Sequence, residues 1–265
     1  MKSKINSVGI ALLLGASILA PAASAKALSP VDAAVADPHR PAADTALDAS
    51  RKPAEILKLI GIKPGAKVVD LFAGDYWDRL FSRMVGPSGK VIAFQSVEMA
   101  KAIKQTLPAK GSAPYPDYPN IVAQSMPIND LPKTVAQTKT VNGIAPPTET
   151  TDVVWMRQNY HDMYDPFMGP ADVAAVDKGI FLSLKHGGLF VVIDHKAPDG
   201  SGLATTNTLH RIDEAVVKKD LIAAGFELFK ESNLYSNPAD PRDKPSSDPS
   251  IQGHTDQFIL VFRRP

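Results

Sequence analysis

Histidine and aspartate side chains gather in four short segments of this chain, and most of these segments follow a predicted strand. The chain has six histidines, and four of them occur in these segments with an aspartate nearby: His161 with Asp162, His195 with Asp194, His210 with Asp213, and His254 with Asp256. Imidazole titrates at a pH of about 6.5, so a histidine that a carboxylate orients can accept a proton near neutral pH. This clustering is the strongest chemical signal in the sequence.

These side chains are compatible with more than one chemistry. We select His161 as a general base, oriented by Asp162 or Asp194, and His195 as the second choice. The alternative is a structural role, in which the histidines hydrogen-bond to loop carbonyl groups. A metal-assisted hydrolase is a further alternative, with Zn²⁺ or Mn²⁺ ligands drawn from His161, Asp194, His195, His210, Asp213 and His254. No H-E-x-x-H or comparable short motif supports it, and we predict no metal site.

An alternation of strand and helix patterns must position these side chains. Short apolar runs predict strands at 67–72, 91–94, 121–124, 152–158, 186–195, 226–232 and 256–265. Periodic patterns and Gly/Pro stops predict helices at 53–62, 77–85, 97–107, 170–185 and 208–224. The pattern indicates an α/β fold with a doubly wound, mostly parallel sheet of seven strands, whose last two strands form an antiparallel edge. Ligands of such sheets bind outside the carboxyl ends of the strands.

The first 25 residues have the pattern of a cleavable signal peptide. Lys2 and Lys4 precede an apolar run at 8–20, and Ala23 and Ala25 supply a small-x-small cleavage site. The run is shorter than the roughly 20 residues that a membrane span needs. We therefore expect cleavage after Ala25, export to the periplasm or the exterior, and no membrane anchor in the mature chain.

The remaining sequence predicts one large domain. Residues 26–52 are expected to form an irregular arm, in which Arg40 and Arg51 either pair with aspartates or bind a carboxylate. Residues 53–265 form the α/β domain, with a polar insertion at 132–151. The net charge is +1, and loss of Lys2 and Lys4 with the leader gives −1, which argues against nucleic acid as a partner. The absence of cysteine excludes disulfides and thiolate chemistry.

Several stretches carry a resemblance to a known family. The sequence "PAEILKLIGIKPGAKVVDLFAGDYWDRLFSRMVGPSGKVIAF", followed by "DVVWMRQNYHDMY" and "LKHGGLFVVIDHKA", resembles the class I S-adenosylmethionine-dependent methyltransferases. More narrowly, together with "GHTDQFILVF" it is similar to a group of exported bacterial predicted methyltransferases. The resemblance covers about 53–265. It implies the sheet described above, and S-adenosylmethionine as the cofactor.

The resemblance also implies a set of cofactor-binding residues: Asp70, Phe72, Ala73, Gly74, Asp75, Tyr76, Gln95, Met126 and Asn159. The family has a G-x-G-x-G turn after the acidic residue, because absent side chains let the backbone approach the cofactor. Here only Gly74 remains, and Phe72 and Tyr76 replace the outer glycines. Their rings are expected either to fill the methionine space or to turn aside and form its wall. Gln95 replaces the usual ribose-binding carboxylate.

These observations predict an S-adenosylmethionine-dependent methyltransferase that acts on an unidentified small molecule. A non-catalytic ligand-binding protein on the same fold is the first alternative, because fold alone does not fix function. In that case Asp70 caps the turn and Gly74 only permits it. The metal-assisted hydrolase is the second alternative.

Overall fold

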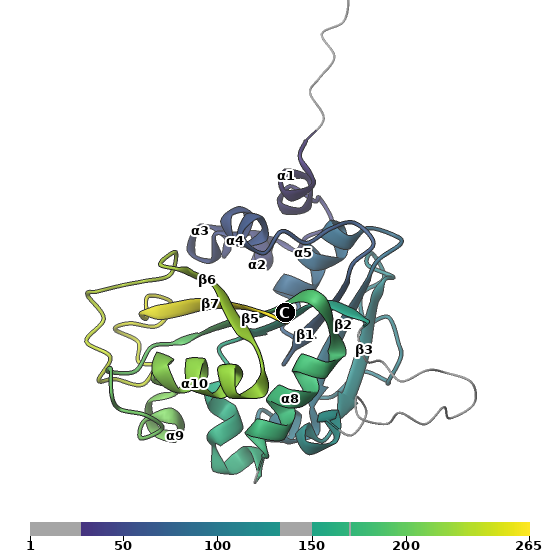
Figure 1. Cartoon of the computed structure of the whole chain (residues 1–265). Helices are drawn as coiled ribbons and strands as arrows, with labels where there is room; N and C mark the ends of the chain where they lie inside the picture. The colour runs from purple at the N-terminus through teal and green to yellow at the C-terminus, as the bar shows by residue number, and fades with distance from the viewer. Residues whose placement is uncertain (1–27, 133–149, 170) are drawn as a thin grey trace, which may run out of the picture.

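The computed structural model describes residues 28–132, 150–169 and 171–265 (Figure 1). The predicted signal peptide lies outside the described residues, as does nearly all of the predicted insertion. Within the described part of the chain, no helix has the length and apolar character needed to cross a membrane.

The centre of the fold is a sheet of seven strands in the order β3-β2-β1-β4-β5-β7-β6. The strands are β1 (Lys67–Leu71), β2 (Lys90–Ser96), β3 (Ile121–Met126), β4 (Thr151–Arg157), β5 (Leu184–His195), β6 (Glu227–Ser232) and β7 (Gln257–Arg263). β7 runs antiparallel to both of its neighbours, while all other pairs of adjacent strands are parallel. The predicted doubly wound, mostly parallel sheet with an antiparallel edge is therefore confirmed.

Helices cover both faces of this sheet (Figure 1). α1 (Pro30–Val35), α4 (Pro53–Ile60) and α5 (Tyr76–Val85) pack on one face, around Trp155 of β4. α6 (Val97–Ala102), α8 (Val173–Ser183) and α10 (Glu214–Ala224) pack on the other. The chain leaves β1 toward one face and β4 toward the other, which makes the carboxyl ends of these adjacent strands the topological switch point, where open α/β sheets bind ligands.

The helix predicted at 208–224 is wrong in its first part. The structure has a short α9 (Thr206–Leu209), which ends at His210 with a left-handed φ of 50°, and α10 begins only at Glu214. Asp213 is the N-cap of α10, since its carboxylate accepts a hydrogen bond from the Ala215 amide at 2.9 Å. His210, Asp213 and Glu214 therefore do not share one helical turn. The helix predicted at 97–107 also ends early, at Ala102.

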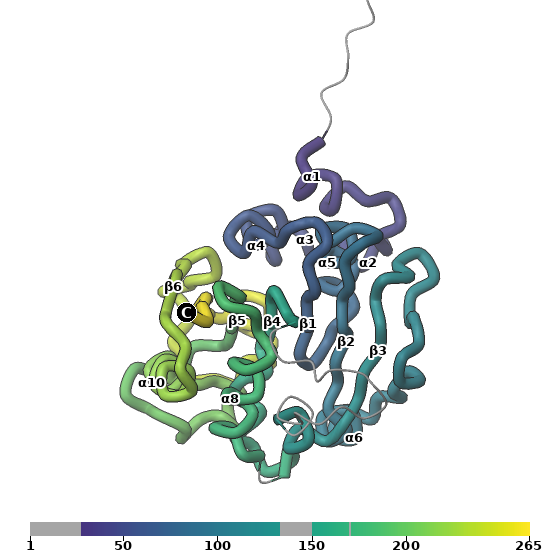
Figure 2. Tube along the Cα trace, turned by 45° about the vertical axis from the view of Figure 1, so that its right-hand side comes forward, coloured from purple at the N-terminus to yellow at the C-terminus, as the bar shows by residue number. Residues whose placement is uncertain are grey.

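The arm that was expected to be irregular contains three short helices and is attached to the domain. α2 (Ala42–Thr45) and α3 (Asp48–Arg51) follow α1, and this segment lies beside α4 and α5 (Figure 2). The guanidinium of Arg40 is buried and donates to both oxygens of Asp48, at 2.9 and 2.5 Å. The Tyr76 hydroxyl donates to the same carboxylate at 2.6 Å. Arg40 is thus structural, whereas Arg51 remains available to a ligand site.

Candidate functional site

A cleft opens beside Gly74, at the carboxyl ends of β1 and β2. It has a volume of about 630 Å³, within the range of small-molecule sites. Of the residues expected to bind a cofactor, seven line it: Phe72, Ala73, Gly74, Asp75, Tyr76, Gln95 and Asn159. A Cβ placed on Gly74 would meet no atom within 4 Å, so this residue faces open space. We call this space the β1–β2 cleft.

The two aromatic side chains that replace glycines form walls of the β1–β2 cleft and leave it open. Tyr76 is 2% exposed, and its ring packs edge-on against Trp77 with the Arg40 and Arg51 guanidinium groups over it. Phe72 adopts a left-handed φ of 62° and packs into the apolar core on the α8 face of the sheet. The second of the two expected arrangements, in which the rings turn aside, is the one observed.

Asp70 is buried below the loop and does not line the cleft. Its carboxyl accepts a hydrogen bond from the Gly74 amide and lies within hydrogen-bonding reach of the buried Asp78 carboxyl. Burial raises the pKa of Asp70 well above its usual value, and the neighbouring Asp78 raises it further. Burial likewise raises the pKa of Asp78 to about 7. Burial therefore favours the protonated form of both acids, and the contact of Asp70 with the Gly74 amide matches the turn-capping role that was considered as an alternative.

We expect Asp78→Asn to stabilise the protein above neutral pH and to flatten its pH dependence. Both carboxyl groups have a higher pKa in the folded than in the unfolded chain, so the folded state binds more protons. The contribution of these two groups to the free energy of unfolding is then fully present below about pH 4. It is lost as the pH rises toward 7 and beyond. Asn removes one of these acids while Asp75 and Arg79, the other charges near Asp78, remain. Urea unfolding at pH 5 and pH 8 measures the effect.

From pH 5 to pH 8, the free energy of unfolding of the wild type should fall by at least about 1 kcal/mol more than that of the variant. Asp117→Asn is the matched control, since this aspartate is exposed and is not among the charges that act on Asp78. If the free energy of unfolding changed with pH equally in wild type and Asp78→Asn, the raised pKa of Asp78 would be contradicted.

The other polar anchors of the cleft are partly occupied. The Gln95 side chain donates to Gln105 at 3.0 Å and accepts from the Ser96 amide at 3.2 Å. Glu98, an acid three residues beyond Gln95, does not line the cleft, and both of its oxygens accept from the Ile128 amide. Met126 lies at the end of β3 and lines a separate apolar cavity, so its predicted place beside the cofactor is not supported.

A second cleft lies beside the first, at the carboxyl ends of β4 and β5, with a volume of about 770 Å³. Leu47 and Arg51 of the arm line both clefts, so the two are neighbours. Arg157 at the end of β4 lines this β4–β5 cleft. Its Nη1 donates to the Gln158 side chain at 2.7 Å, and its Nε is buried and has no hydrogen-bond partner among the described residues. Burial lowers the pKa of Arg157 to about 10, which leaves it charged at neutral pH. The cleft therefore offers two guanidinium groups to a ligand.

His195, the second-choice base, is at the end of β5 and lines the β4–β5 cleft. Its Nδ1 is 2.7 Å from the Thr255 hydroxyl, and this contact fixes the ring and leaves Nε2 for a ligand. Burial lowers the pKa of His195 to about 3, so the ring is neutral in the folded protein.

His161, the first-choice base, is held from both sides and lines neither cleft. Its Nδ1 is 2.8 Å from the Asp194 carboxylate, and its Nε2 is 3.3 Å from both Asp162 Oδ1 and His210 Nδ1. Burial alone would lower the pKa of His161, but the charges of Asp194 and Asp162 raise it to about 10. The role of general base for His161 stays a prediction without support from its position.

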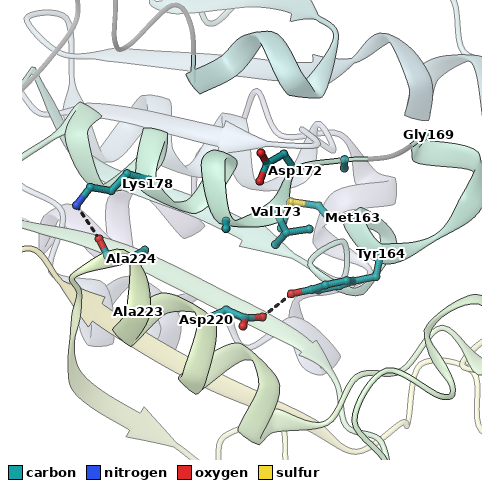
Figure 3. Close-up of a pocket in the computed structure, with 11 residues that line it drawn as sticks. Met163, Tyr164, Gly169, Asp172, Val173, Lys178, Asp220, Ala223 and Ala224 are labelled. Carbon is teal, nitrogen blue, oxygen red and sulfur yellow. Dashed lines mark hydrogen bonds between the residues drawn. The ribbon is translucent and has the colours of Figure 1, made fainter.

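A third cavity lies between α8 and α10 (Figure 3). Its polar groups already pair across it, because Lys178 donates to the Ala224 carbonyl at 3.1 Å and the Tyr164 hydroxyl donates to Asp220. These polar groups are therefore committed to contacts within the protein.

Comparison with known proteins gives likeness in structure only. No protein-family model matches the chain, and no curated protein matches its sequence. Two of the similar solved structures are S-adenosylmethionine-dependent methyltransferases. That from Aquifex aeolicus has a TM-score of 0.49 and 17% identity over 85% of this chain and 99% of its own. That from Mesorhizobium loti has a TM-score of 0.48 and 19% identity over 82% and 100%.

Another similar structure is that of SpnF, a [4+2]-cyclase, which has a TM-score of 0.49 and 13% identity over 84% of this chain and 82% of its own. Likenesses at these values carry no evidence on activity or ligand. The chemistry of the chain therefore has to be inferred from its own clefts.

Some site residues were not found from the sequence. Arg157 reads as part of an apolar strand, and Asp165 follows His161 by four positions without a recognised motif. A polar residue at the last position of a buried strand was the available signal for Arg157. His254 lines the β4–β5 cleft as expected for a rim residue, but Asp213 holds the amides of Gly200 and Gly202 and is structural.

Proposed function

We propose that the protein binds S-adenosylmethionine in the β1–β2 cleft and transfers its methyl group to a small anionic molecule in the β4–β5 cleft. The observation that carries this proposal is the open space at Gly74, which persists although two aromatic residues replace glycines in the turn. It borders the switch point between β1 and β4, because Asn159, just after β4, also lines it, and ligands of open α/β sheets bind at this point.

The residues of the first cleft suit the parts of this cofactor. The loop from Ala73 to Asp75 would approach the methionine moiety, since nothing projects from Gly74. Gln95, at the end of β2, would bond the ribose hydroxyls by exchanging its contact with Gln105. When bound, the cofactor supplies an electrophilic methyl group.

The residues of the second cleft suit an acceptor with a carboxylate or phosphate. Arg157 has a buried Nε with no partner, and a bidentate anion would satisfy it. Arg51 lies at the junction of the clefts and would orient the same anion. His195 has a pKa lowered to about 3, so its neutral ring would orient the acceptor by hydrogen bonding through Nε2. An acceptor that is already an anion has no proton to lose before methyl transfer. Export, as the leader at 1–25 predicts, is part of this proposal.

Calorimetric titration of residues 26–265 with S-adenosylmethionine and S-adenosylhomocysteine tests the proposal. We expect one site per chain and a melting temperature that rises with ligand, because the ligand binds only the folded state. With the cofactor bound, small acids should be methylated in preference to their neutral esters. No heat and no thermal shift at millimolar ligand would refute cofactor binding.

A non-catalytic binding protein is the second candidate. Two observations favour it: Asp70 is buried with Asp78, and Gln95 is already bonded to Gln105. In that case small acids should bind the β4–β5 cleft with unchanged affinity whether or not S-adenosylmethionine is present.

A further inference from the structure

Four side chains that line neither cleft converge on one point. They are His161 and Asp162 of the 3₁₀ turn η2 (His161–Tyr164), Asp165 directly after it, and His210 at the end of α9. One ligand atom from each lies within 4.8 Å of all the others. We call this group the His/Asp cluster.

The spacing of these atoms fits a single small cation. His161 Nε2 is 3.3 Å from His210 Nδ1 and 3.3 Å from Asp162 Oδ1, and the latter two atoms are 3.7 Å apart. Zn²⁺ binds nitrogen and oxygen at about 2.0–2.1 Å in tetrahedral sites, and the ligands of such a site are about 3.3–3.4 Å apart. Three of the four atoms are thus nearly placed as one face of a tetrahedron.

Asp165 supplies an independent indication of a missing partner. It is 1% exposed, and among the described residues neither carboxylate oxygen has a hydrogen bond of ordinary geometry. The Thr206 hydroxyl is near enough to act on this carboxylate, but its hydrogen bond of ordinary geometry goes to the Leu203 carbonyl, at 3.3 Å. Asp165 Oδ2 lies 4.0 Å from His210 Nδ1, on the side of the cluster. A buried carboxylate without a donor is costly, and a cation would satisfy it.

Asp194 and Asn159 hydrogen-bond to the side chains of the cluster and orient their ligand atoms, as neighbouring polar groups do in metal sites. Asp194 is fully buried and holds Nδ1 of His161, which directs Nε2 toward the cluster. Asn159 donates to Oδ2 of Asp162 at 2.8 Å, which leaves Oδ1 for an ion. Carboxylate and amide partners of this kind fix the tautomer and position of metal ligands.

We propose that His161, Asp162, Asp165 and His210 bind one divalent transition-metal ion, and that Zn²⁺ suits this donor set best. Two imidazoles favour Zn²⁺ over Mg²⁺ or Ca²⁺, which prefer oxygen. Because all four positions are filled by protein, the site is structural and fastens the segment around His210 to η2. It does not depend on methyl transfer.

The test is metal analysis and zinc titration of residues 26–265 after removal of any His-tag. We expect one Zn²⁺ per chain by mass spectrometry and a melting temperature raised by about 5–10 °C at 100-fold excess over the dissociation constant. X-ray absorption should show four nitrogen or oxygen ligands at about 2.0–2.1 Å, two of them imidazole.

Asp165→Asn and His210→Gln should each weaken zinc binding at least about 100-fold, since loss of even outer partners of a metal site costs 10–100-fold. His186→Gln, a histidine remote in sequence whose Nδ1 contacts the Pro265 carbonyl, is the control and should bind like the wild type. The His210 side chain is half-exposed, so we expect its variant to fold, and circular dichroism checks this. Zinc binding that is absent, or that is equal in all three variants, would overturn the proposal.

Discussion

Gly74→Leu should abolish binding of S-adenosylmethionine and S-adenosylhomocysteine while the protein keeps its stability. The backbone at Gly74 is outside the left-handed region, and a Cβ there has no atom within 4 Å. The leucine side chain would therefore enter the β1–β2 cleft without strain and occupy ligand space. We expect affinity to fall at least about 100-fold, equivalent to roughly 2.7 kcal/mol. Calorimetric titration measures the loss.

The free energy of unfolding should change by no more than about 1 kcal/mol, as for substitutions away from packed groups. Gly74→Ala should have an intermediate affinity, because a single methyl fills less of the cleft. Ala223→Leu, which adds comparable bulk on the exposed side of α10, should bind like the wild type. If Gly74→Leu still binds the cofactor, the ligand lies elsewhere and the assignment of this cleft is wrong.

Arg211→Met should destabilise the protein by about 3–5 kcal/mol, the usual cost of removing one partner from a buried ion pair. Arg211 and Asp240 are fully buried at their side chains, and the guanidinium contacts both carboxylate oxygens, at 2.9 and 3.2 Å. It also donates to the Lys244 and Lys196 carbonyls, at 2.8 and 3.0 Å. Met leaves a buried negative charge and two unpaired carbonyls. Urea denaturation measures the loss.

The double variant Arg211→Met/Asp240→Asn separates the charge from the packing. Asn removes the uncompensated charge but can still accept from the Arg242 and Asp256 amides, which donate to Asp240. We expect the double variant to recover at least about 1 kcal/mol of the loss. A single variant that loses less than about 1 kcal/mol would show that this pair does not hold the loop between β6 and β7.

The sequence predicts the sheet well because apolar strands and Gly/Pro stops are local signals. The alternation of strands and helices predicts that the carboxyl ends of β1, β4 and β5 lie at one edge of the sheet. It therefore also predicts that His161, Asp194 and His195 gather at that edge. Boundaries near polar caps are less predictable. The pattern at 208–224 reads as one helix, but the buried Arg211 and the cap at Asp213 interrupt it, and both depend on distant residues.

The state of individual site residues could not be predicted for the same reason. Asp70 reads as a cofactor ligand, yet Asp78 becomes its neighbour only once α5 packs on β1. Phe72 and Tyr76 leave the cleft open because the core accepts one ring and Asp48 of the arm accepts the hydroxyl of the other. His161 reads as a free base, and its enclosure by Asp194, Asp162 and His210 emerges only in three dimensions.

The attachment of the arm has a consequence for any shortened version of the protein. A polypeptide that began at Pro53 would retain every strand, and sequence patterns alone would mark it as the complete domain. It would nevertheless lose Leu47 and Arg51, which line both clefts, and Asp48, which accepts the hydrogen bond of the Tyr76 hydroxyl. Both clefts of such a truncated protein would lack part of their lining. A failure of this protein to bind a ligand would therefore not be evidence about the intact molecule.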